Sequence, residues 1–262
     1  MRIALTIAGS DSGGGAGIQA DLKTFQRFGV FGTSAITAIT AQNTRGVSRW
    51  EPVSPDLVRA QINSVAEDLP PAAFKTGMLA TAAIASAVAA AIDAYAFTNY
   101  VLDPVMVASS GDVLFESDTI DTIRTQLIPR SFLVTPNIHE AQILVGEKID
   151  DEDGMARAAE TIVTELGAQA ALVKGGHLDS GDRLVDILYD GSVRAFRSQR
   201  VATTSTHGTG CTLSAAITAQ LAKGESLHAA VRQSVDYVHN AIATAPGLGS
   251  GHGPLNHLAA DG

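Results

Sequence analysis

The chain's single cysteine lies in a glycine-rich stretch at residues 206–212, where Gly208, Thr209 and Gly210 precede Cys211. An apolar repeat at helical spacing follows over residues 211–223 and ends at Gly224, which predicts that the cysteine lies in the first turn of a helix. The first amides of a helix lack internal partners and its dipole adds partial positive charge, so a phosphate or a developing oxyanion would bind there. The same position is expected to lower the pKa of the thiol. A loop in which the cysteine merely packs is the competing interpretation.

Polar residues follow several short apolar runs that we expect to be strands. Asp103 follows residues 100–102, Asn137 and Glu140 follow residues 132–135, and Lys174 follows residues 170–173; the runs at 3–8 and 33–41 lead likewise to Ser10-Asp11 and Gln42-Asn43. Ligands of open parallel sheets bind outside the carboxyl ends of the strands. Asp103 and Glu140 suit Mg²⁺, which takes carboxylates together with substrate phosphates, and a lysine neutralises phosphate charge.

Each of these residues has an ordinary structural explanation, because Asp, Asn and Gly are common in turns and caps. For Asn137 we expect a cap on the helix that starts at His139. Together with the anion-binding helix start, however, they predict a phosphate site with a divalent metal. The chemistry that follows is phosphoryl transfer to a small hydroxyl compound.

Two other nucleotide-binding motifs are not supported. Ile18 occupies the place where a dinucleotide fingerprint starting at Gly13 needs its third glycine, and the chain has no Walker-type phosphate loop. His139, His177 and His207 have no metal-ligand spacing with the cysteine and are expected in loops or caps, with His207 as the one functional candidate.

Strand and helix patterns alternate almost to the end of the chain, which predicts βαβ units and a mainly parallel sheet covered on both faces. Residues 183–189 and 192–197, separated by Asp190-Gly191, predict a hairpin that adds antiparallel strands at one edge. We expect a single domain, residues 1–262. Strands are predicted at 3–8, 33–41, 73–76, 100–102, 132–135 and 170–173; helices at 20–28, 55–68, 81–95, 117–127, 139–144, 155–166, 211–223 and 226–244, before a glycine-rich tail at 246–254.

The composition limits the function classes. The 262 residues are 45% hydrophobic and 17% charged, with a net charge of −9 and no basic cluster, which disfavours a nucleic-acid surface. One cysteine allows no internal disulfide, and the apolar runs 3–8 and 78–92 are too short for a signal or membrane segment. A cytoplasmic protein that binds small molecules, not membranes, is expected.

In its ordered motifs the chain resembles the hydroxymethylpyrimidine/phosphomethylpyrimidine kinases of thiamin biosynthesis, within the ribokinase-like superfamily. The resemblance spans nearly the whole chain and implies a three-layer α/β/α sandwich with a mainly parallel central sheet. The motifs that carry it are residues 8–21, 41–44, 75–79, 103–106, 135–141, 173–177 and 206–212.

The resemblance implies that Mg²⁺ and ATP serve to phosphorylate 4-amino-5-hydroxymethyl-2-methylpyrimidine and then its monophosphate. Gln42 and Asp21 would form hydrogen bonds with the ring nitrogens and the amino group. Without the resemblance, Asp21 would be assigned to a solvent-facing helix position. Cys211 would accept the hydroxymethyl proton, beside charge held by Gly208, Thr209 and Gly210. The implied pyrimidine contacts are Gly9, Ala16, Asp21, Gln42, Met78 and Val105; the implied ATP and phosphate contacts are Lys174, Asp103, Asn137 and Thr206; the metal ligands are Asp103 and Glu140.

Two departures from the family pattern occur. Ser109-Ser110-Gly111 lacks a lysine that the family usually carries before this Ser-Gly, which bears on the second phosphorylation, and residues 138–139 replace the usual Leu-Pro spacer. Pyridoxal kinase is the nearest alternative enzyme. A non-catalytic pyrimidine-binding regulator is the alternative from another class, although the chain retains Cys211, Asp103, Glu140 and Lys174. The family also suggests a homodimer and leaves a monovalent cation open.

Overall fold

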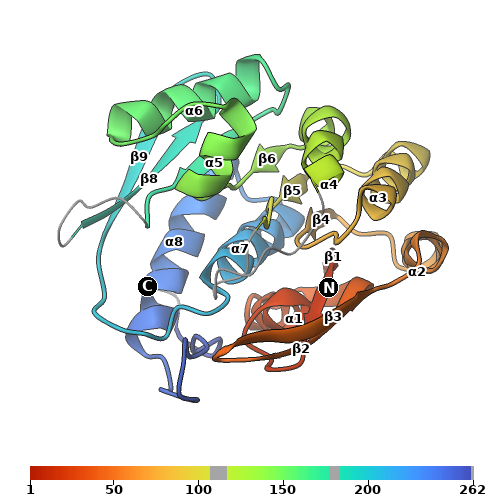
Figure 1. The fold of residues 1–262 in the computed structure, drawn as a ribbon, viewed down its shortest axis with the longest axis horizontal. Helices are drawn as coiled ribbons and strands as arrows, with labels where there is room; N and C mark the ends of the chain where they lie inside the picture. The colour runs from red at the N-terminus through yellow and green to blue at the C-terminus, as the bar shows by residue number, and fades with distance from the viewer. Residues whose placement is uncertain (107–116, 177–182, 261–262) are drawn as a thin grey trace.

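In the computed structural model, which describes residues 1–106, 117–176 and 183–260, nine strands form one sheet in the order β3-β2-β1-β4-β5-β6-β7-β8-β9 (Figure 1). The six neighbouring strands β2, β1, β4, β5, β6 and β7 are mutually parallel. At one edge β3 runs antiparallel to β2, and at the other β8 and β9 each run antiparallel to the preceding strand. The strands are β1 (Ile3–Asp11), β2 (Phe31–Asn43), β3 (Gly46–Pro52), β4 (Ala73–Thr76), β5 (Tyr100–Leu102), β6 (Leu133–Val134), β7 (Ala171–Lys174), β8 (Arg183–Tyr189) and β9 (Val193–Gln199).

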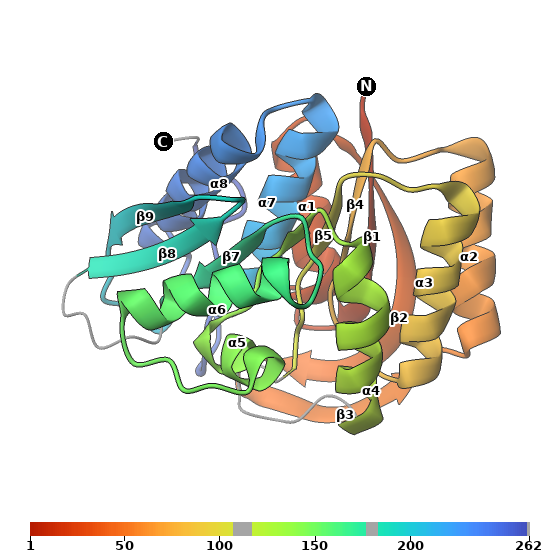
Figure 2. The ribbon, with the colours of Figure 1, turned by 90° about the horizontal axis from the view of Figure 1, so that it is seen from above.

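Helices cover both faces of the sheet (Figure 2). Successive strand residues point to opposite faces, so that Phe74 packs in one core with α2, α3, α5 and α6, while Ala73 packs in a second core with α1, α7 and α8. The result is the expected three-layer sandwich. The helices are α1 (Gly17–Arg27), α2 (Pro55–Asp68), α3 (Ala82–Tyr95), α4 (Ser117–Thr122), α5 (Ile138–Val145), α6 (Glu152–Thr164), α7 (Thr209–Lys223) and α8 (Leu227–Ala243).

The helix starts differ in a way that matters for the site. Side chains of Ser54, Thr81, Asp151 and Ser226 accept hydrogen bonds from the first turns of α2, α3, α6 and α8. The N-caps of α1 and α7 are instead Ala16 and Gly208, and neither makes a side-chain capping bond. At the start of α7 the amide of Thr209 donates to the carbonyl oxygen of Thr206 at 3.3 Å, and no capping side chain occupies the amides of Gly210 and Cys211 that follow.

Most predicted elements are confirmed, some with identical bounds, and the hairpin of β8 and β9 lies at a sheet edge as expected. The prediction missed β3, because Ser48, Arg49 and Glu51 give this exposed edge strand no regular apolar alternation. The helix predicted over 117–127 is confirmed as an α-helix over Ser117–Thr122 (α4) and was wrong in type only beyond it, where a π-helical turn, Ile123–Leu127, and a 3-10 turn, Ile128–Arg130, follow. None of the helices in the described ranges is long and apolar enough to cross a membrane.

Candidate active site

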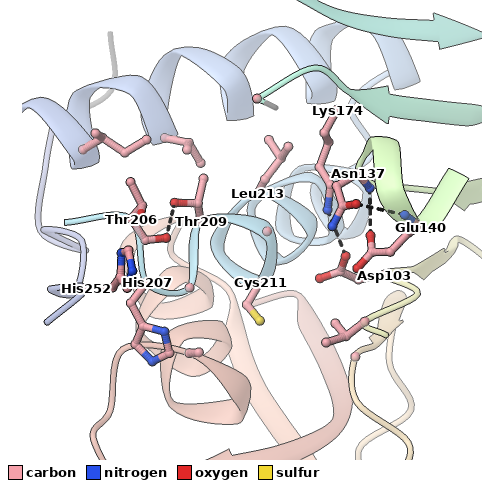
Figure 3. A pocket seen from close by; sticks show the side chains of 18 of the residues that line it. Asp103, Asn137, Glu140, Lys174, Thr206, His207, Thr209, Cys211, Leu213 and His252 are labelled. Atoms are coloured by element: carbon pink, nitrogen blue, oxygen red, sulfur yellow. Dashed lines mark hydrogen bonds and ion pairs between the residues drawn. The ribbon is translucent and has the colours of Figure 1, made fainter. Parts of the chain in front are cut away.

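A cavity of about 790 Å³ opens at the carboxyl ends of β1, β4, β5 and β7, beside the first turn of α7. In Figure 3, Asp103, Glu140 and Lys174 gather on one side of Cys211, and Thr206, His207 and His252 lie on the other. The predicted site residues line this cavity with the exception of Asp21: they are Gly9, Ala16, Gln42, Met78, Val105, Asp103, Asn137, Glu140, Lys174, Thr206, Gly208, Thr209, Gly210 and Cys211.

The loop before α7 is held by close backbone packing. Gly208 adopts a left-handed conformation (φ 81°), and a Cβ there would lie 1.9 Å from the carbonyl oxygen of Gly15. A Cβ on Gly210 would lie 3.2 Å from the Nζ atom of Lys174. At position 208 only glycine lets this loop rest on the loop after β1, and at position 210 glycine keeps the start of α7 close to the lysine.

Cys211 lies in the first turn of α7, as predicted, and the amide of Gly17 at the start of α1 donates a hydrogen bond to its sulfur. The expected fall in the pKa of its thiol is wrong. Burial raises the pKa to about 11; the positive charge of Lys75 offsets this, while the carboxylates of Asp21 and Asp103 add to it. At neutral pH the thiol is protonated, because its desolvation outweighs the stabilisation of the thiolate by the helix starts and by Lys75.

Lys75, which supplies that charge, was missed by the sequence reasoning. Its side chain is fully buried in β4, and its Nζ atom lies 3.0 Å from Oδ1 of Asp21, which is also fully buried. The other Asp21 oxygen accepts a hydrogen bond of 2.6 Å from Thr6. Burial alone would lower the pKa of Lys75, but the negative charges of Asp21, Cys211 and Asp103 and the hydrogen bond to Asp21 together outweigh it, and the pKa lies above its ordinary value.

Asp21 is therefore neither solvent-facing, as its helix position alone indicated, nor part of the cavity lining. It lies behind the cavity wall, with both carboxylate oxygens engaged. The available signal was a charged residue, Lys75, inside a short central strand, where a buried charge needs a partner.

Lys174 and two carboxylates form the charged cluster of the cavity. Lys174 Nζ lies 3.2 Å from Oδ1 of Asp103, and Ser214 Oγ donates to Oδ2 of Asp103 at 3.2 Å. Burial works to raise the pKa of Asp103, but the charges of Lys174 and Lys75 hold it below its ordinary value. This pair is ionised.

Glu140 completes the cluster and has a second task. Asn137 caps α5, as predicted, through a capping box: Glu140 N donates to Asn137 Oδ1 at 3.0 Å, and Asn137 N donates to Glu140 Oε2 at 2.7 Å. Burial raises the pKa of Glu140 to about 7; the charge of Lys174 lowers it and that of Asp103 raises it. Two carboxylates thus share one lysine, leaving negative charge that a cation would neutralise.

The opposite end of the cavity is built on Asp11 and Gln42. Asp11 Oδ2 accepts hydrogen bonds from the amides of Gly15 and Ala16 and lies 2.9 Å from His207 Nε2. Gln42 Nε2 lies 3.5 Å from the same histidine nitrogen. His207, buried in this network, ties the loop before α7 to the loop after β1; His177 and the segment with Ser109-Ser110-Gly111 lie outside the described residues.

Apolar side chains of α7 and α8 form a further part of the cavity lining, the apolar slot, which sequence reasoning did not assign. Val235, Val238 and Ile242 lie at helical spacing on one face of α8 and line the cavity with Leu213 of α7. Helix periodicity identifies such residues as core, and nothing in the sequence separates those that pack from those that face a ligand.

This fold and site define a small-molecule kinase of the ribokinase-like class, because an anion-binding helix start, a lysine and two carboxylates meet at the ends of parallel strands. Residues 11–256 match the family model for phosphomethylpyrimidine kinase. The chain belongs to the phosphomethylpyrimidine kinase family.

Individual relatives agree with this assignment. The chain is 50% identical over 257 residues to a hydroxymethylpyrimidine/phosphomethylpyrimidine kinase of Bacillus subtilis, covering 98% of this chain and 94% of the relative. The phosphomethylpyrimidine kinase structure from Clostridium difficile has a TM-score of 0.83 and 42% identity, covering 92% of this chain and all of that one. The ADP complex of a Bacillus subtilis pyridoxal kinase has a TM-score of 0.91 and 39% identity, covering 99% and 98%.

Proposed function

We propose that this chain transfers a phosphoryl group from ATP to the hydroxymethyl group of 4-amino-5-hydroxymethyl-2-methylpyrimidine, and then a second one to the monophosphate, in thiamin biosynthesis. The observation that supports this most is the place of the α7 start. Its uncapped amides and Cys211 lie in one cavity between the Lys174–Asp103 pair and Gln42. A phosphoryl group held there would face a heterocycle on one side and a nucleotide on the other.

The nucleotide end of the cavity supports ATP as donor. The base would enter the slot of Leu213, Val235 and Val238, while Lys174 and the amides after Gly208 bind phosphate oxygens. Asn137 beside Lys174 and Thr206 on the other side of Cys211 also line the cavity and would add polar contacts. Charge that shifts onto the leaving oxygen in phosphoryl transfer would meet these fixed donors.

Mg²⁺ fits the donor set of Asp103 and Glu140, since both offer hard oxygen ligands and their charge exceeds that of Lys174. The described residues hold no group of three or more His, Cys, Asp or Glu side chains suited to a metal, so phosphate oxygens and water would complete the coordination. When bound, the ion neutralises phosphate charge.

The substrate end supports a polar-edged heterocycle in apolar walls. Gln42 offers a donor and an acceptor, and Gly9, Ala16, Met78 and Val105 would pack on the ring. Asp21, in this proposal, contributes through Lys75 instead of touching the ring, because both of its oxygens are engaged.

Cys211 is the proposed proton acceptor for the hydroxymethyl group. With a pKa of about 11 the thiolate form costs about 5 kcal/mol at neutral pH. A rate limited by the thiolate therefore rises about tenfold per pH unit below that pKa. A kcat that does not change with pH would show that Cys211 is not the proton acceptor and only holds the hydroxyl group in place.

One assay tests the main proposal: ATP consumption with hydroxymethylpyrimidine, counting phosphates transferred per pyrimidine. Two phosphates per pyrimidine are expected, and no transfer would contradict the assignment. Pyridoxal is a second candidate substrate, because the pyridoxal kinase structure is so similar in fold. A kcat/KM higher for pyridoxal than for hydroxymethylpyrimidine would favour it.

Four further properties belong to the same proposal: a single domain over residues 1–262, a homodimer, a cytoplasmic location and a possible role for a monovalent cation. A purely regulatory role is disfavoured, since Cys211, Asp103, Glu140 and Lys174 all line the cavity. Sedimentation and assays with and without K⁺ test the dimer and the cation.

A further inference from the structure

The glycine-rich segment after α8 has no part in the chemistry proposed above. Glycines recur at positions 247, 249, 251 and 253. The segment runs beside the connection between β2 and β3, as the dark-blue chain next to their orange ends shows (Figure 1). It also reaches the loop before α7, through a hydrogen bond of 3.1 Å from His207 N to the Gly253 carbonyl oxygen.

On one side the segment is bonded to Thr44. His252 N donates to the Thr44 carbonyl oxygen at 2.7 Å, and Gly251 N donates to Thr44 Oγ1 at 3.3 Å. A Cβ on Gly249 would lie 2.3 Å from Thr44 Oγ1, and one on Gly251 would lie 2.1 Å from the Thr44 carbonyl oxygen. Neither glycine has room for a side chain unless Thr44 moves.

On the other side the segment holds the loop that leads to Cys211. A Cβ on Gly253 would lie 2.8 Å from Ser205 Oγ, and Pro254 forms a β-bridge with His207. His207 is in turn bonded to Asp11. The same short segment therefore contacts the β2–β3 connection and the loop before α7.

Thr44 comes two residues after Gln42 in the chain, and Gln42 lies beside His207. We propose that residues 249–254 form a clamp that sets the distance between Gln42 and the α7 start, and so determines affinity for the heterocyclic substrate. This inference rests on the proposed function only in assigning the heterocycle to Gln42. The glycines and Thr44 are positioning residues, since they act through Gln42.

The decisive variants are Gly249→Ala and its matched control Gly247→Ala. Both glycines have positive φ, 83° and 66°, so alanine meets the same backbone cost, but nothing lies within 4 Å of a Cβ at position 247. Gly249→Ala should raise the KM for hydroxymethylpyrimidine about tenfold or more. The KM for ATP should stay within about twofold, because the nucleotide end lies away from Thr44, and Gly247→Ala should change neither value by more than this.

If Gly249→Ala folds poorly, a second substitution that removes the steric conflict still tests the proposal. The three atoms nearest to a Cβ on Gly249 all belong to the Thr44 side chain, so Thr44→Gly removes the conflict. The double variant should recover pyrimidine affinity relative to Gly249→Ala. No recovery, or equal losses for pyrimidine and ATP, would overturn the clamp.

Hydrogen exchange without substrate separates this inference from the proposed function. The amide of His252, bonded to Thr44, should exchange faster in Gly249→Ala than in Gly247→Ala. Equal exchange in the two variants would refute the clamp whatever the substrate. If the wild-type protein fails to phosphorylate hydroxymethylpyrimidine but the exchange difference holds, the proposed function fails and the clamp stands for whichever ligand contacts Gln42.

Discussion

Lys75→Met is the most informative single substitution, because it leaves the buried carboxyl group of Asp21 without its charged partner. Both side chains have no solvent exposure. Breaking a buried pair in this way costs about 3–5 kcal/mol of the free energy of unfolding. At roughly 2–4 °C per kcal/mol for a domain of this size, Tm should fall by roughly 6–20 °C.

Urea unfolding and calorimetry measure this cost, and two further variants interpret it. Lys148→Met breaks the ion pair with Asp150, whose side chains are 80% and 66% exposed, and should cost about 1 kcal/mol or less. The double variant of Lys75→Met with Asp21→Asn removes both charges and keeps an acceptor for Thr6. It should be clearly more stable than Lys75→Met alone.

A second readout follows the thiol. Lys75 is the main positive charge that offsets the burial of Cys211, so its removal should raise the thiol pKa further and slow alkylation at a fixed alkaline pH. The reasoning is refuted if Lys75→Met is as mild as Lys148→Met, or if alkylation is unchanged in folded Lys75→Met protein.

The remaining predictions concern single side chains. Cys211→Ala should lower kcat by about 10²-fold or more with little change in pyrimidine binding; activity near that of the wild type would remove the thiol from the mechanism. Gln42→Ala should raise the KM for hydroxymethylpyrimidine about tenfold and that for ATP far less, and equal effects on both would contradict its assigned place. Burial lowers the pKa of His257 to about 4, so the unfolded chain takes up its proton near pH 6.5 before the folded protein does, and stability falls by about 3 kcal/mol between pH 6.5 and 4. His257→Gln should reduce that fall in urea unfolding measured across this pH range, and an unchanged pH dependence would exclude His257 as its source.

The sequence was sufficient for the parallel strands, the edge hairpin, the helical layers and the line of polar residues at the strand ends. Those features depend on periodicity and on residue type, as the capping box of Asn137 and Glu140 illustrates. A motif that lies in one stretch of chain, such as the glycines before Cys211, is visible before the fold is known.

Features that depend on distant segments could not be predicted. The direction in which the pKa of Cys211 shifts depends on desolvation by packed neighbours and on Lys75 in β4. The sequence at the start of its own helix reveals neither. Asp21 appeared to be a surface residue because its partner lies 54 positions further along the chain. The edge strand β3 has a polar sequence and is held by pairing with β2.

The meeting of two helix starts at one sulfur atom has a consequence for how ligands arrive. The ends of α1 and α7 each contribute about half a positive charge at short range, yet the protein as a whole carries a net charge of −9. At 0.1 M salt the net charge repels an approaching nucleotide mainly within a Debye length of about 10 Å, and the nucleotide meets the local positive potential only once it reaches the helix starts in the cavity. Added salt should therefore speed nucleotide association while weakening the bound complex, so that ionic strength shifts on-rate and affinity in opposite directions.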